Sequence, residues 1–75
     1  MEGSTPISNV MYDILRAMGE DAEFLYDAID TYIKDAQTAN KNNLLDTWNK
    51  IKTDRLSHMN MLKEALEEEI HANAQ

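Results

Sequence analysis

Five polar residues of the sequence could meet and do chemistry: Glu23, Tyr26, Asp27, Arg55 and His58. Carboxylate and imidazole groups ligate divalent metal ions, so Glu23 and His58 could hold a metal together with residues of a second copy. The interpretation that we favour is an ion pair between Glu23 and Arg55 with His58 beside it, because a half-buried polar cluster can fix the register of two helices. The remaining alternative is that these side chains are simply exposed.

Apolar spacing predicts that two long helices carry these residues. The helix over about residues 21–39 has apolar residues at alternating steps of three and four, which is the pattern of a coiled-coil seam: Ala22, Leu25, Ile29, Tyr32, Ala36 and Ala39. In the helix over about residues 43–72, Arg55 and His58 fall on the same stripe as the apolar residues of its inner face, so both should face the other helix. The predicted core consists of Leu25, Ile29, Tyr32, Trp48, Ile51 and Leu62.

The helices should be joined by a tight turn at residues 39–43. Three asparagines lie there, at positions 40, 42 and 43, and asparagine tolerates left-handed backbone conformations. Antiparallel pairing around this turn brings Tyr26 near Arg55 and Glu23 near His58. Upstream, Thr5 and Pro6 predict the start of a short N-terminal helix, at about residues 6–18, and Gly19 should end it.

The expected fold is therefore all-α, with one domain over residues 1–75: a short N-terminal helix plus a long antiparallel αα-hairpin. The last helix should be about 45 Å long and the helix before it about 30 Å. Part of the longer helix would then lack a partner unless the short helix folds over it or another chain covers it, and this mismatch is the main reason to predict a homodimer that forms a four-helix bundle.

The segment over about residues 20–66 resembles half of a ferritin-like bundle. Helical hairpins of that family carry an inward Glu on one helix and Glu-x-x-His on the next. The matching stretches here are EDAEFLYDAIDTY and IKTDRLSHMNMLKEAL. The resemblance implies that Glu23 and His58 are metal ligands, while the second Glu of the family falls on Arg55, which has no acceptor to offer a metal.

Composition limits the function further. The net charge is −7, which argues against direct binding to nucleic acid phosphates. There is no cysteine, no secretory signal and no apolar run of the roughly 20 residues that cross a membrane, so we expect a cytoplasmic protein. Glycine-rich phosphate loops are absent, and Ser57 and His58 are adjacent rather than stacked, so we expect no enzyme.

The sequence thus predicts a non-enzymatic protein that acts through self-association and needs no cofactor. Two alternatives stay open. One is a degenerate ferritin-like protein that binds a divalent metal. The other is an acidic inhibitor or decoy of a nucleic-acid-binding protein, suggested by acid-rich helix faces at Asp13, Glu20, Asp27, Asp30 and residues 64–69.

Overall fold

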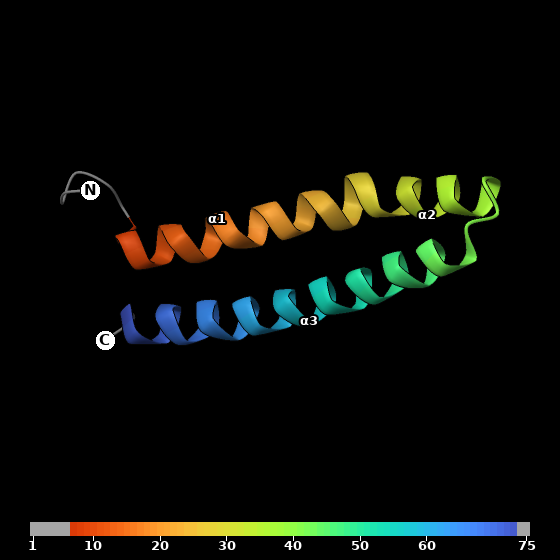
Figure 1. Ribbon diagram of the computed structural model, residues 1–75. Coiled ribbons are helices and arrows are strands. Elements are labelled where there is room, and N and C mark those ends of the chain that lie inside the picture. The colour runs from red at the N-terminus through yellow and green to blue at the C-terminus, as the bar shows by residue number, and fades with distance from the viewer. Residues whose placement is uncertain (1–6, 74–75) are drawn as a thin grey trace.

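The computed structural model describes residues 7–73, which form two helical arms joined by one turn. The first arm consists of α1 (Asn9–Glu23), the wide-turn segment η1 (Phe24–Ala28) and α2 (Ile29–Thr38), and the second arm is α3 (Asn42–Asn73). The arms run antiparallel, so the start of α1 and the end of α3 lie opposite the turn (Figure 1). Within residues 7–73 there is no strand, so the predicted all-α hairpin is confirmed.

The first arm begins at a serine cap. The Ser8 hydroxyl accepts a hydrogen bond from the backbone N–H of Met11 at 3.1 Å, which satisfies one of the free donors at the helix start. The helix therefore begins at Asn9 and not at residue 6. Thr5 and Pro6, which carried the predicted start, lie outside the described residues.

Gly19 lies inside α1, so the predicted helix end at this residue is wrong. Glycine in a helix costs only about 0.5–1 kcal/mol relative to alanine, and packing of α1 against α3 outweighs that preference. The short N-terminal helix is consequently the first part of one long arm. This arm is nearly as long as the 32 residues of α3, so the expected overhang of the last helix is also wrong.

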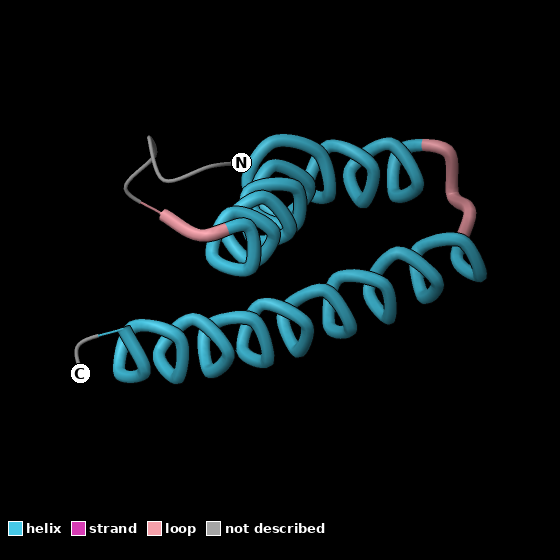
Figure 2. The backbone as a smooth tube through the Cα atoms, turned by 90° about the vertical axis from the view of Figure 1, so that its left-hand side faces the viewer, coloured by secondary structure: helices cyan, strands magenta, loops and turns pink. Residues whose placement is uncertain are grey.

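A wider turn interrupts the first arm at Phe24–Ala28. The backbone N–H of Ile29 donates to the carbonyl of Phe24, five residues back instead of four, which is the pattern of a π-bulge. Figure 2 views α1 nearly along its axis and α2 from the side, so the arm changes direction between them. The extra residue offsets the side-chain stripes of α1 and α2, and both segments contact α3.

The turn between the arms closes as predicted, around an asparagine. Asn40 has φ 58°, and it is the one non-glycine residue with positive φ among residues 7–73. The N–H of Lys41 donates to the carbonyl of Ala36, and the N–H of Asn40 donates to that of Gln37. These two hydrogen bonds form a Schellman motif, which ends α2 and lets the chain reverse.

The hairpin buries few side chains. Among residues 7–73 only Ile29 and Ala36 are buried, at 0% and 3% exposure. Of the other predicted core residues, Tyr32 is exposed, and the rest are half-buried: Leu25, Trp48, Ile51 and Leu62. None of the helices described is long and apolar enough to cross a membrane.

Asn40 offers a test of the turn. Replacement of Asn40 by valine should lower the free energy of unfolding by about 1–2 kcal/mol, because a side chain branched at Cβ is strained in the left-handed region, which asparagine tolerates. Replacement by glycine should leave the stability equal or higher, since glycine adopts this conformation without strain. Urea unfolding of both variants at one protein concentration measures the difference, and equal stabilities would contradict the turn described here.

Candidate functional site

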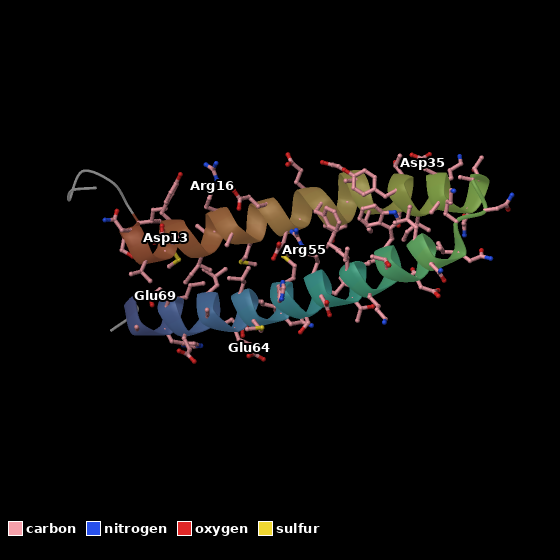
Figure 3. All side chains as sticks on the ribbon, viewed as in Figure 1. Asp13, Arg16, Asp35, Arg55, Glu64 and Glu69 are labelled. Atoms are coloured by element: carbon pink, nitrogen blue, oxygen red, sulfur yellow. The ribbon has the colours of Figure 1, made fainter. Side chains whose placement is uncertain are left out.

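Arg55 lies between the two arms and contacts both a carboxylate and an aromatic ring (Figure 3). Its Nη1 donates to Oδ1 of Asp21 at 2.9 Å, and its guanidinium carbon lies 4.6 Å from the centre of the Phe24 ring. The Asp21 side chain is only 14% exposed, so the ion pair is partly shielded from water. A cation over a ring face adds about 0.5–1 kcal/mol at a site of this exposure.

Two further aromatic rings continue this set of contacts toward the turn. The rings of Phe24 and Tyr32 meet edge to face with centroids 6.0 Å apart, and those of Tyr32 and Trp48 are tilted by 42° at 5.0 Å. Aromatic pairs in such geometries contribute beyond the area that they bury. Together with Asp21 and Arg55 these rings form what we call the inter-arm cluster: Asp21, Phe24, Tyr32, Trp48 and Arg55.

Two ion pairs outside the inter-arm cluster are more exposed. Lys52 Nζ lies 3.2 Å from Oδ1 of Asp30, and Arg16 Nε lies 3.6 Å from Oε2 of Glu20. Exposed pairs of this kind contribute little to stability. The pKa of Arg16 is raised above its ordinary value mainly by its hydrogen bond to the Tyr12 hydroxyl, and the charge of Glu20 adds to this effect.

The predicted polar cluster does not form. Arg55 faces the first arm as expected, but its partner is Asp21, so the predicted ion pair with Glu23 is wrong. Glu23 follows Asp21 by two residues and therefore points about 200° away from it around the helix. Three other predicted members are exposed as well: Tyr26, Asp27 and His58.

Sequence reasoning missed Asp21 because it placed this residue at the start of a helix, where a carboxylate caps the backbone. Asp21 is in fact in the interior of α1, since the helix continues through Gly19. The spacing held a usable signal, because Met11, Ile14, Met18, Asp21 and Leu25 follow one another at steps of three and four. Asp21 thus continues the apolar stripe of α1 and should face α3.

The side chains of Glu23 and His58 belong to no larger set of ligands. Within residues 7–73, no group of three or more His, Cys, Asp or Glu side chains is placed to hold a metal ion. A metal at Glu23 and His58 would therefore need further ligands from a second copy of the chain. The geometry of one copy gives this alternative no support.

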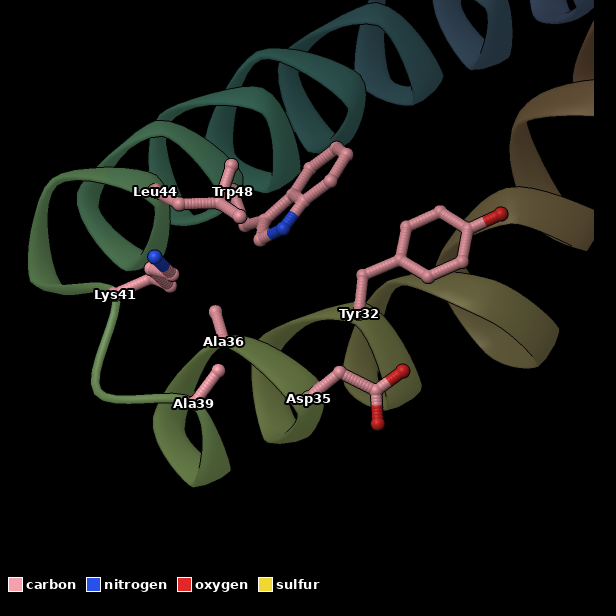
Figure 4. A pocket seen from close by; sticks show the side chains of 7 residues that line it. All are labelled: Tyr32, Asp35, Ala36, Ala39, Lys41, Leu44 and Trp48. Carbon is pink, nitrogen blue, oxygen red and sulfur yellow. The ribbon is translucent and has the colours of Figure 1, made fainter.

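A groove of about 220 Å³ lies beside the inter-arm cluster, next to the turn (Figure 4). Tyr32 and Trp48 form its aromatic side, and Ala36 and Leu44 add apolar surface, while Asp35 and Lys41 are the charged residues of its lining. The groove is bordered by no nucleophile with a base beside it. It suits the packing of an apolar side chain better than a reaction.

Comparisons with protein-family models, with curated proteins and with solved structures found no match to this chain. The resemblance to ferritin-like hairpins therefore stays a prediction, and the interpretation of the inter-arm cluster depends on its geometry. In that geometry Asp21 and Arg55 pair across the arms, and the aromatic rings pack on one another.

The role of Asp21 can be tested against its neighbour Glu23. Asp21→Asn removes the charge that Arg55 pairs with in a half-buried site, and should lower the free energy of unfolding by about 1–2 kcal/mol. Glu23→Gln changes an exposed side chain and should alter it by less than about 0.5 kcal/mol. Denaturant unfolding at matched protein concentration measures both values. A larger loss in the Glu23 variant would contradict the observed pairing.

Proposed function

We propose that this protein is a non-enzymatic helical protein that acts by self-association, with two hairpins stacking into a four-helix bundle. The observation that carries the proposal is the exposure of apolar side chains. Although only two residues are buried, nine large hydrophobic side chains in the described part of the chain are each at least 40% exposed: Val10, Tyr12, Leu15, Tyr26, Tyr32, Leu44, Leu56, Met61 and Ile70.

The shape of the hairpin explains this exposure. Its extents are 53 × 21 × 13 Å, so it is one helix thick and two helices wide. Stable domains consist of at least two packed layers, because a helix pair on its own has no layer to cover its broad faces. A second hairpin stacked on the first would supply the missing layer and complete a bundle core.

The inter-arm cluster supports a structural role. Its ion pair and its stacked rings hold the two arms at a fixed register, and a cluster of this kind specifies which residues face outward together. Asp21 and Arg55 form an ion pair with each other at 2.9 Å. The cluster thus holds the two arms in one arrangement, and their exposed sides form a rigid surface for a partner.

The oligomeric mass tests the proposal. Sedimentation equilibrium should give twice the chain mass of 8.6 kDa at micromolar concentrations, and the thermal midpoint should rise with protein concentration, because association is linked to folding. A folded monomer of constant midpoint across this range would contradict self-association.

A second candidate, the acidic decoy, is favoured by a strip on the outer side of the first arm. Asp13, Glu20 and Asp27 follow one another at intervals of seven residues, and all three are exposed. Binding of a basic protein to this strip would weaken at about 1 M salt, where charge interactions are screened within roughly 3 Å. Self-association through apolar side chains should persist there, so the salt dependence separates the two functions.

A further inference from the structure

The hairpin has two broad faces, and the distribution of charge separates them. On α3, Lys52, Lys63 and Glu67 lie within about 40° of Leu56 around the helix, so this side carries more base than acid. Asp54, Met61 and Glu68 follow one another at intervals of seven on the opposite side together with Lys50, so that side carries more acid than base. Two copies of an acidic chain meet with less repulsion through the face that carries Leu56.

The face of Leu56 also has a groove of about 410 Å³. Its apolar lining comes from Leu25 and Tyr26 of the first arm and from Leu56 and Met59 of α3. Its charged lining is the ion pair of Asp30 and Lys52, whose charges offset each other. Tyr26 is 84% exposed and Leu56 is 50% exposed, so this groove offers apolar surface from both arms at once.

A second stripe of the first arm borders this groove. Its members Leu15, Gly19, Ala22 and Tyr26 follow one another at steps of four, three and four, which places them along one line of the helix. We call this line the outer seam. It holds no charge, and its order is symmetric about its middle, with a large residue at each end and two small residues between them.

Gly19 of the outer seam has no packing role within the hairpin. A Cβ placed on it would meet nothing within 4 Å, although glycine weakens a helix relative to alanine. Small residues let two helix backbones approach closely. A second helix that crosses at Gly19 and Ala22 could approach closely there. That contact would explain a glycine at position 19, whereas the packing of the single hairpin does not.

We propose that the second copy docks antiparallel on this face, with Leu15 against Tyr26 of the second copy and Gly19 against its Ala22. This inference rests on the proposed self-association and identifies its surface and direction. A two-fold interface requires that each contact occur twice with the roles exchanged, and the symmetric order of the outer seam satisfies this requirement. Arg16 then lies beside Glu23 of the second copy, on the outer flank of both helices.

Charge along the hairpin supports the antiparallel direction. The acids Asp13, Glu64 and Glu69 lie toward the end where α1 begins and α3 ends (Figure 3), and Lys41 lies at the turn (Figure 4). Residues 64–75 hold four acids and no base, whereas residues 34–63 hold six bases and three acids. Antiparallel stacking sets the acidic end of each copy against the turn end of the other, and parallel stacking would set the two acidic ends together.

Matched substitutions test the surface. Gly19→Leu and Tyr26→Gln should each weaken the dimer about 100-fold or more, because both copies lose the contact at once. Ser57→Leu and Met61→Gln make comparable changes at exposed positions on other sides of α3, and should alter the dissociation constant by less than about 3-fold. Circular dichroism should show equal helix content in all four variants, since leucine and glutamine are good helix formers.

The outcomes of sedimentation separate this inference from the function that it rests on. A dimeric wild type with weakened Gly19 and Tyr26 variants and intact controls supports the outer seam. A dimeric wild type in which the controls weaken instead, or in which all four variants behave alike, overturns the seam and leaves self-association standing. A monomeric wild type ends the proposed function itself.

A spin label tests the direction. The chain has no cysteine, so Lys41→Cys places one label on the turn of each copy. The antiparallel dimer should give a label distance near the 53 Å length of the hairpin. Parallel stacking would bring the labels to within about 30 Å, since packed helices lie only 8–10 Å apart, and a distance in that range would overturn the antiparallel arrangement.

Discussion

Two helices side by side can bury only the stripe along which they touch, and this constraint shapes the whole molecule. The hairpin closes along one line, where Ile29 and Ala36 are the buried residues among those described. The other apolar residues between positions 7 and 72 share their surface with water to some degree. Burial of apolar area is the main force that stabilises a fold, so a layer one helix thick is poorly stabilised on its own. The proposals for function follow from this shortage of burial.

Because the apolar contact between the arms is a narrow stripe, the polar and aromatic contacts across the arms contribute more to fixing their register. Apolar stripes can slide past each other by one turn at little cost, whereas the 2.9 Å contact between Asp21 and Arg55 exists at one register only. The ring of Phe24 beneath the guanidinium limits its position further. A half-buried pair of this kind contributes modestly to stability and more to the choice of a single arrangement.

The sequence predicted the parts of the fold that depend on strong local signals. The turn at Asn40 follows from the preference of asparagine for left-handed backbone, and the two arms follow from apolar periodicity. Gly19 misled the prediction because a single glycine is a weak signal that packing against α3 overrides. The partner of Arg55 could be read from the apolar stripe of α1 only with Gly19 placed inside that helix. The π-bulge at Phe24–Ala28 could not be predicted, since none of those five residue types is specific to a wider turn.

That same π-bulge makes the first arm tolerant of a change in chain length in one place. The wide turn holds one residue more than a turn of α-helix, so deletion of a single residue between Phe24 and Ala28 should leave a regular α-helix in which α1 keeps the side that faces α3. An α-helix turns by about 100° per residue, so the same deletion between Asp21 and Glu23 would swing everything upstream by that angle relative to α2. Met18 would then leave the side that faces α3, and the acidic strip of Asp13 and Glu20 would rotate with it.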